Sequence, residues 1–233
     1  MNTAQAAPVN TSLLPLLLVI TSSTPEGATP RQARGASATK RLEALKRTGD
    51  ADHGKEAYAV CAQCHLWSGA GRNDGLFPQL AGQHSTVIIK QLADIRSGVR
   101  DNPLMYPYAA TLTDPQEIAD IAAYIHTLEI PSSNGWGPGR DLAEGQRVYE
   151  TNCVACHGPR GEGNAEAFVP VIAGQHYKYL LRQLIDIQEG SRRNANPAMV
   201  KLLGQRSKRE LDAVADYVSR LRTPASTPTV STR

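Results

Sequence analysis

The feature that most constrains the fold is an internal repeat, in which residues recur at a displacement of 92 positions. The Leu-Ala-Gly-Gln-His run at 80–84 returns as Ile-Ala-Gly-Gln-His at 172–176. Further along, Asn-Pro-x-Met occurs at 102–105 and again at 196–199, where the displacement has grown to 94. A period of about ninety residues is far longer than a solenoid unit. The sequence therefore predicts duplication of a whole domain, with a short loop insertion in the second copy.

The repeat divides the 233-residue chain into a leader, two domains, a linker and a tail. We expect the leader at 1–49, the domains at 50–131 and 140–222, the linker at 132–139 and a disordered tail at 223–233. The linker consists largely of turn formers such as Gly, Pro and Ser. Residues 13–20 form an apolar stretch that is too short to span a bilayer but is typical of a signal-peptide core. The leader therefore predicts an exported protein that is not integral to the membrane.

Each copy has the apolar periodicity of helices. Apolar residues recur with helical spacing at 88–95, 118–128, 180–187 and 211–221. Asp114 and Pro115 form a helix start in the first copy, and Ser207 with Glu210 has the form of a capping box in the second. No segment shows a convincing strand alternation. The predicted fold class is all-α, with two tandem domains that each form a small helical unit.

Each copy also contains one Cys-x-x-Cys-His motif. The motifs are Cys61, Cys64 and His65 in the first copy, and Cys153, Cys156 and His157 in the second. Two cysteines three residues apart on a helical turn project to the same side, so both thiols can form thioethers with the vinyl groups of one haem. The adjacent histidine can then bind the iron as its proximal ligand. The sequence therefore predicts two covalently attached haem c groups, one in each domain.

Other uses of the cysteines fit the sequence less well. A zinc site would combine thiolates and histidines, but the two pairs lie far apart in separate repeats and each has only one adjacent histidine. A thioredoxin-like motif belongs in a βαβ setting that this sequence does not predict. A disulfide between two cysteines separated by only two residues would contribute little to the stability of the fold. Haem attachment remains the preferred interpretation.

Two methionines are candidates for the sixth iron ligand. Apart from Met1, the chain contains only Met105 and Met199, and they occupy matching places in the Asn-Pro-x-Met loops of the two copies. A thioether ligand favours ferrous iron and suits an electron carrier, because six-coordinate iron has no open position for a substrate. Core packing of the methionines is one alternative. Ligation by His84 and His176, which also match between copies, is another, although we favour a capping or loop-fixing role for these histidines.

With these residues together, the chain resembles class I cytochromes c and, in its tandem form, the dihaem cytochrome c4 type. The resemblance covers about residues 50–222 and includes the Pro-x-Leu/Ile-x-Gly-Gln stretches at 78–83 and 170–175. It implies covalent haem c and His/Met axial ligands in each domain, around which the helices fold. It also implies that the carbonyl groups of Pro78 and Pro170 accept the Nδ1 proton of the proximal histidine.

The resemblance further implies a periplasmic electron carrier. Its expected donor is a bc1-type complex or a dehydrogenase, and its expected acceptor is a terminal oxidase or reductase. Nucleic acid is not among the expected partners. One alternative is a cytochrome subunit of a larger dehydrogenase. The other is a dihaem peroxidase, which needs one open iron and is disfavoured by the second methionine.

Charge is unevenly divided between the copies. Residues 54–131 contain five Lys and Arg against eight Asp and Glu, whereas residues 140–222 contain thirteen against ten. A chain with an acidic and a basic half has a dipole that can orient it in the field of a charged partner. The alternative is two solvated surfaces whose charge has no functional consequence.

Overall fold

The computed structural model describes residues 41–222, and these residues form an all-α fold, as predicted. The expected signal-peptide core and the expected disordered tail lie outside the described residues. Within 41–222 there is no β-strand, and the sole β-bridge pairs Asn164 with Val169. The helices are α2 (Ala51–Ala57), α3 (Ala59–His65), α4 (Ser85–Arg96), α5 (Tyr106–Thr111), α6 (Pro115–Thr127), α7 (Leu142–Asn152), α8 (Val154–His157), α9 (Tyr177–Gln188), α10 (Pro197–Leu203) and α11 (Lys208–Arg220).

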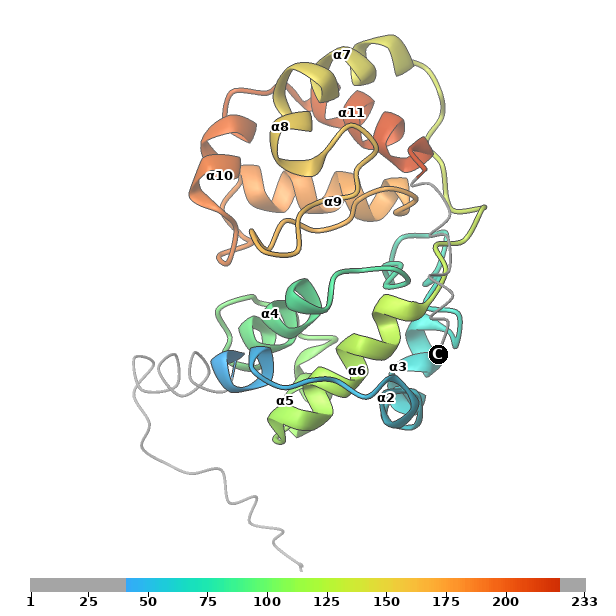
Figure 1. Cartoon of the computed structure of the whole chain (residues 1–233). Helices are drawn as coiled ribbons and strands as arrows, with labels where there is room; N and C mark the ends of the chain where they lie inside the picture. Colours follow the sequence, from blue (N-terminus) through green and yellow to red (C-terminus); the bar gives the residue numbers. More distant parts are fainter. Residues whose placement is uncertain (1–40, 223–233) are drawn as a thin grey trace, which may run out of the picture.

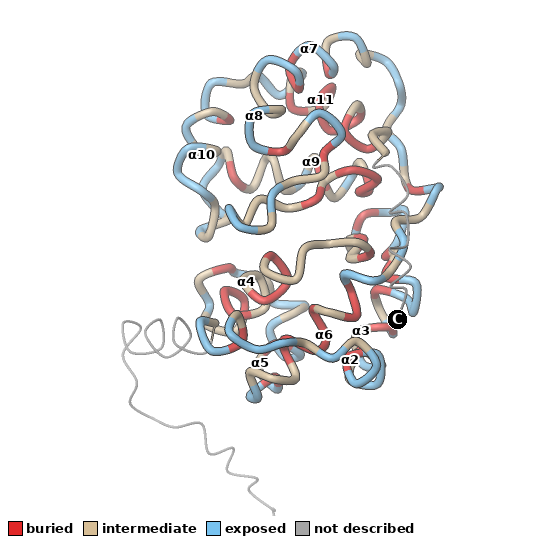
Figure 2. The backbone as a smooth tube through the Cα atoms, in the orientation of Figure 1, coloured by how far each residue is buried: buried red, intermediate tan, exposed pale blue. Residues whose placement is uncertain are grey.

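The helices gather into two lobes that correspond to the two sequence repeats (Figure 1). Helices α2 to α6 form the first domain, and α7 to α11 form the second. In each domain the helix that precedes the Cys-x-x-Cys-His motif packs against the last helix, α2 on α6 and α7 on α11. Buried segments run through the interior of both lobes (Figure 2). Each domain therefore has its own core, as duplication of a whole domain requires.

The predicted caps begin the last helix of each domain. Asp114 accepts a hydrogen bond from the backbone N–H of Gln116, and Pro115 occupies the first helical position of α6. In α11, Ser207 and Glu210 form the reciprocal capping box. Each cap satisfies backbone N–H groups that have no partner inside the helix. These local signals explain why both helices begin where the sequence predicted.

The packed part of the first domain begins before residue 50. Residues 41–45 are helical, and Ala44 is fully buried within the core cluster that also contains Tyr58 and Ile121. The carbonyl of Thr48 accepts a hydrogen bond from the Gln116 side chain. Apolar periodicity alone did not reveal this segment, because it contributes only one short turn of helix to the core.

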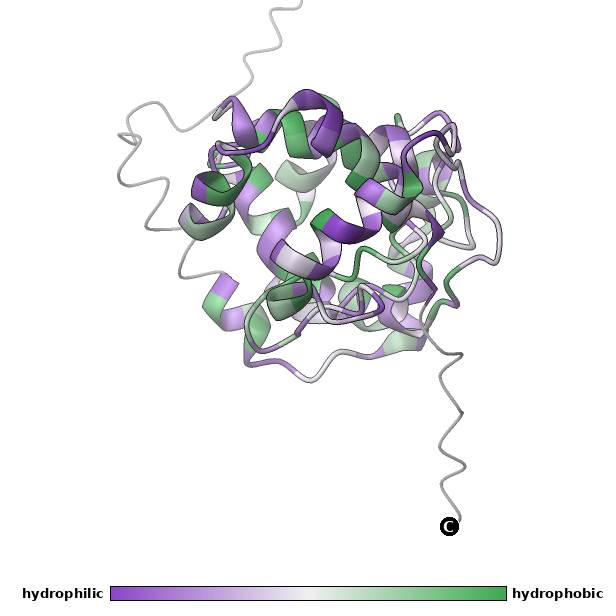
Figure 3. Ribbon diagram, turned by 90° about the horizontal axis from the view of Figure 1, so that it is seen from above, coloured by the Kyte–Doolittle hydropathy of each residue, from purple (hydrophilic) through white to green (hydrophobic). Residues whose placement is uncertain are grey.

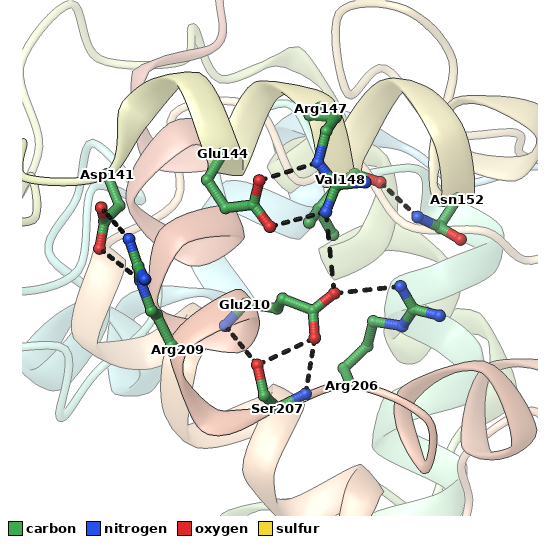
Figure 4. Close-up of polar contacts among 9 residues, drawn as sticks. All are labelled: Asp141, Glu144, Arg147, Val148, Asn152, Arg206, Ser207, Arg209 and Glu210. Carbon is green, nitrogen blue, oxygen red and sulfur yellow. Dashed lines mark hydrogen bonds and ion pairs between the residues drawn. The ribbon is translucent and has the colours of Figure 1, made fainter.

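Ion pairs join α7 to α11 in the second domain (Figure 4). Arg209 contacts Asp141 at 2.9 Å, and Arg147 lies between Glu144 at 2.6 Å and Glu210 at 4.0 Å. Individual exposed pairs contribute little to stability, whereas a network that connects two helices also restricts how they slide. This network lies at the start of the helix that leads to Cys153.

The linker is held against the second domain. The Asn134 side chain is buried and donates to the carbonyls of Gln175 and Ser219, both at 2.9 Å. The Trp136 indole N–H donates to Asn134, and the Arg220 guanidinium lies 5.2 Å from the centre of the Trp136 ring. The linker is therefore part of the second domain's surface rather than a free tether.

None of the helices within 41–222 is both long and apolar enough to cross a membrane. Viewed from above, hydrophilic and hydrophobic residues alternate along the helices (Figure 3). This is the pattern of helices with one face toward a core and one toward water.

Candidate haem sites

The cysteines of each motif lie within one turn of helix. Cys61 and Cys64 belong to α3, whereas Cys153 lies at the junction of α7 and α8 and Cys156 lies inside α8. All four are free thiols. Burial raises the pKa of Cys61 and of Cys153 to about 11, so these thiols are neutral in the apoprotein. Paired, partly accessible thiols on one helical turn fit a group attached through two thioethers.

Each motif histidine is buried and held by the predicted proline. His65 is 3% exposed, and its Nδ1 donates to the carbonyl of Pro78 at 2.8 Å. His157 makes the equivalent contact with Pro170 at 3.3 Å. Burial lowers the pKa of both histidines, and the proline carbonyls only partly oppose this effect. Each imidazole is therefore neutral, with its proton on Nδ1 and the Nε2 lone pair available to a metal.

Two glycines allow the proline loop to close over the histidine. Gly71 has a φ of +67° and Gly163 a φ of +71°, and their N–H groups donate to the carbonyls of His65 and His157. A Cβ atom on Gly71 would lie 2.5 Å from the Pro78 carbonyl oxygen. The space beside each glycine is taken by the backbone of the same loop.

The two methionines lie at the start of short helices rather than in open loops. Met105 is the N-cap of α5, and Met199 lies within α10. The loop expectation is wrong for Met199, because Asn196 caps α10 and Pro197 fits its first turn. Met199 also packs against the core cluster that contains Leu203. Both methionines are partly buried.

His84 and His176 connect the two domains. The Nε2 atom of His84 donates to the carbonyl of Glu162 at 2.9 Å, and that of His176 donates to the carbonyl of Ala70 at 2.8 Å. His176 also accepts a hydrogen bond at Nδ1 from the backbone N–H of Gly135. This loop-fixing role is the one that the sequence favoured over iron ligation, but its extension across the interface was not predicted.

Glutamine side chains form a second matched pair of bridges. Gln83 bonds both the N–H and the C=O of Val171, and Gln175 bonds both backbone groups of Gln79, at 2.9 to 3.0 Å. Because 79 and 171 are equivalent in the repeat, as are 83 and 175, the interface has approximate twofold symmetry. The loops that hold His65 and His157 are thus also the loops that join the domains.

The zinc alternative gains no support from the geometry. Across residues 41–222, no group of three or more His, Cys, Asp and Glu side chains lies close enough together to hold a metal ion. Each motif histidine is instead paired with a backbone carbonyl, and the two cysteine pairs lie in different lobes. The donor set fits one macrocyclic metal complex in each domain.

Comparison with known proteins decides the family. The family model for cytochrome c matches the chain twice, at residues 51–129 and 142–222. The chain belongs to the cytochrome c family. Its two matches correspond to the two lobes of the structure, so this cytochrome is a tandem dihaem protein. The fold prediction of two cytochrome c domains in tandem is therefore confirmed.

Individual relatives identify the type of cytochrome. The cytochrome c4 of Pseudomonas aeruginosa is 34% identical over 185 residues, which are 74% of this chain and 89% of that protein. The thiosulfate dehydrogenase electron acceptor of Stutzerimonas stutzeri is 38% identical over 172 residues, covering 69% of this chain and 78% of its own length. The solved structure of reduced cytochrome c4 from Pseudomonas stutzeri superposes with a TM-score of 0.67 at 30% identity, over 75% of this chain and 100% of the other.

These similarities establish the cofactor and the general function. The cytochrome is of the dihaem c4 type and carries two covalently attached haem c groups. It is an electron carrier that exchanges electrons with redox partners, and it is not an enzyme. The peroxidase alternative is therefore set aside.

Proposed function

We propose that Cys61 and Cys64 attach the first haem, with His65 and Met105 as the axial ligands of its iron. Cys153, Cys156, His157 and Met199 do the same in the second domain. Bound haem supplies a one-electron couple between ferric and ferrous iron. The protein's own residues hold the axial ligands in place, so that little rearrangement accompanies electron transfer.

The contact between His65 Nδ1 and the Pro78 carbonyl carries this proposal. This contact orients the imidazole ring with its proton on Nδ1, and it leaves the Nε2 lone pair as the donor to the iron. Buried His65 has no competing protein partner at Nε2 among the hydrogen bonds of residues 41–222. In contrast, the Nε2 atoms of His84 and His176 are used by carbonyl groups, which favours the methionines as the sixth ligands.

The cellular role follows from the type of cytochrome. We place the protein in the periplasm, between a donor such as a bc1-type complex or a dehydrogenase and an acceptor such as a terminal oxidase or reductase. A second candidate role is that of a dedicated electron acceptor for a dehydrogenase. The 38% identity to a protein named thiosulfate dehydrogenase electron acceptor favours this role.

Optical spectroscopy of the purified holoprotein tests the ligand set. A pyridine haemochrome assay should give two c-type haems per chain, and the ferric protein should show the weak red-region band of sulfur ligation. The ferrous protein should not bind carbon monoxide, because a six-coordinate iron has no free position. A high-spin haem or binding of carbon monoxide by the unmodified protein would refute His/Met ligation at that site.

The partner role is tested by separate assays. Rapid mixing with a purified bc1-type complex and with a thiosulfate dehydrogenase should show which donor reduces the cytochrome faster. Reduction by the dehydrogenase alone would favour the dedicated acceptor, and reduction by the bc1-type complex would favour the respiratory carrier.

A further inference from the structure

One peptide group connects the motif histidine of the first domain to the second domain. The carbonyl of the peptide between Pro78 and Gln79 accepts the Nδ1 hydrogen of His65 at 2.8 Å. The N–H of the same peptide donates to the Oε1 atom of Gln175, in the second domain, at 3.0 Å. A single planar amide therefore carries the histidine of its own domain on one side and a glutamine of the other domain on the opposite side.

The second domain contains the same arrangement in reverse. The carbonyl of Pro170 accepts from His157 at 3.3 Å, and the N–H of Val171, which belongs to the same peptide, donates to the Oε1 atom of Gln83 at 2.9 Å. Corresponding residues of the two arrangements are separated by the repeat displacement of 92. Each series of histidine, peptide group and glutamine forms a relay, and each domain supplies the glutamine of the other domain's relay.

The glutamine amides are held with their oxygen atoms toward the peptide N–H groups. The Oε1 atom of Gln175 also accepts the backbone N–H of His176 at 3.0 Å, and its Nε2 atom donates to the carbonyl of Gln79 at 2.9 Å. Gln83 makes the equivalent contacts, at 3.1 and 2.9 Å. Turning either amide over would place its NH2 group against two N–H donors. The partners of each glutamine therefore fix the direction in which its relay is polarised.

The relay of the first domain is shielded from water. Gln175 is 7% exposed, Gln79 is 6% exposed and His65 is 3% exposed. Hydrogen bonds in such surroundings polarise one another along a chain. When Oε1 of the glutamine attracts the peptide hydrogen, the carbonyl oxygen of that peptide becomes a better acceptor for the histidine hydrogen. The glutamine of one domain thus acts on the imidazole of the other.

We propose that Gln175 and Gln83 are positioning residues for the motif histidines of the opposite domains, and that each lowers the reduction potential of the haem in the domain opposite its own. This inference rests on the proposed axial ligation by His65 and His157. A stronger acceptor at Nδ1 makes the imidazole more basic, and a more basic imidazole stabilises ferric iron. Contact between the domains therefore sets both potentials lower than the separate domains would have.

The two relays should differ in strength. Their glutamine contacts are nearly equal in length, at 3.0 Å for Gln175 and 2.9 Å for Gln83. Their histidine contacts are not, because His65 lies 2.8 Å from its proline carbonyl and His157 lies 3.3 Å from its own. A longer final hydrogen bond transmits less polarisation. The haem of the first domain should therefore respond more strongly to its glutamine than the haem of the second domain does.

A redox titration of the holoprotein followed by nuclear magnetic resonance tests the crossing. The signals of each haem are assigned through contacts with its own Cys-x-x-Cys-His motif, which does not depend on the axial ligands. In Gln175→Leu the equilibrium constant for reduction of the first domain's haem should rise about threefold, or about 28 mV at about 59 mV per tenfold. In Gln83→Leu the second domain's haem should shift in the same direction by a smaller factor. The haem in each variant's own domain should change by less than about 1.5-fold.

Thr86→Val is the matched control for loss of an interdomain hydrogen bond. The Oγ1 atom of Thr86 donates to the carbonyl of Ala165 across the interface at 2.6 Å, away from the peptides that bind the motif histidines. Valine has nearly the same shape as threonine, so this variant should leave both potentials unchanged. In the ferrous protein, the Nδ1 proton signal of His65 should move to lower chemical shift in Gln175→Leu, because its hydrogen bond weakens, and should stay in place in Thr86→Val.

Several outcomes would overturn the relay. These are unchanged potentials in both Leu variants, a shift confined to the haem of the variant's own domain, equal shifts of both haems, and shifts in Thr86→Val as large as those in the Leu variants. If a Leu variant does not retain haem, Gln175→Glu and Gln83→Glu keep an oxygen acceptor. They should lower the potential of the opposite domain's haem more than that of their own, and the reverse order would reject the relay.

Failure of the ligand assignment has a separate signature. In the unmodified ferric protein, the ring signals of His65 and His157 should show the large shifts that a paramagnetic iron causes in its own ligands. Their absence would refute axial ligation by these histidines, and the relay with it. Their presence together with unchanged potentials in the Leu variants would refute the relay alone.

Discussion

His176 in the second domain donates its Nε2 hydrogen to the carbonyl oxygen of Ala70 in the first, at 2.8 Å. The other ring nitrogen accepts the N–H of Gly135 in the linker at 3.0 Å. Only a neutral imidazole can make both contacts, since a protonated ring has no acceptor. One side chain thus joins both domains and the linker, and it does so only in one protonation state.

The domain interface should weaken in mild acid. Burial lowers the pKa of His176, so between its folded value and the ordinary value of about 6.5 the unfolded chain binds more protons than the folded chain. The contribution of His176 to the free energy of unfolding is therefore fully present above about pH 6.5 and falls as the pH drops below this value. Denaturant unfolding of the holoprotein at a series of pH values measures the slope of the free energy of unfolding against pH. His176→Gln keeps an N–H donor without the titration, so a slope that is unchanged in this variant would contradict the assignment.

Removing either methionine should open one iron. In Met105→Ala or Met199→Ala the ferrous protein should bind one equivalent of carbon monoxide, and the red-region band should lose about half its intensity. Optical titration measures both effects. Leu202→Ala, which truncates an apolar side chain in the same helix as Met199, is the control for packing loss and should leave both spectra unchanged. Unaltered spectra in both methionine variants would disprove the ligand assignment.

Gly71→Ala should destabilise the first domain more than Gly98→Ala. Both glycines have a φ of +67°, but a Cβ on Gly71 meets the Pro78 carbonyl at 2.5 Å, whereas a Cβ on Gly98 meets nothing within 4 Å. We expect a loss of about 1 kcal/mol for Gly98→Ala from conformation alone, and about 3 kcal/mol for Gly71→Ala. Chemical denaturation measures the difference, and equal losses would show that the loop accommodates the extra atom.

Leu66→Gly should stabilise the protein. Leu66 has a φ of 64° and a ψ of 157°, a region that is nearly exclusive to glycine, and the equivalent residue of the second domain is Gly158. Its side chain is 46% exposed, so little packing is lost. Relief of strain should outweigh the added flexibility of the unfolded chain by about 1 kcal/mol. Gly158→Leu is the reciprocal control and should destabilise; a lower denaturation midpoint for Leu66→Gly would contradict the strain argument.

Much of the fold was predictable because its signals are local or periodic. Asp114 and Ser207 begin α6 and α11 as their sequence contexts indicate. The apolar spacing that defines α4 and α9 needs no knowledge of the partner domain. The proline contact of His65 was expected from the family resemblance, and the structure contains it.

The interface was not predictable from such signals. The glutamines at 83 and 175 were recognised as repeated residues, but nothing in a single sequence says that each one binds the other copy's backbone. Arg100 and Arg192, whose side chains donate hydrogen bonds across the interface, also recur at the repeat displacement and were overlooked, because a lone arginine in a loop usually faces solvent. The signal that could have revealed them is their recurrence together with Gln91 and Gln183.

The interdomain bridges from Gln83, Gln175, His84 and His176 all end on backbone atoms. These hydrogen bonds therefore do not depend on the side chains of the residues that accept them. The side chains at these positions differ between the copies: Gln79 is equivalent to Val171 in the repeat, and Ala70 is equivalent to Glu162. A face of this kind is complementary to itself, so two identical single-domain chains could pair through it as a symmetric dimer. When the two copies are joined in one polypeptide, the surface residues and the charge of each domain can change independently, while the hydrogen bonds between the domains are kept.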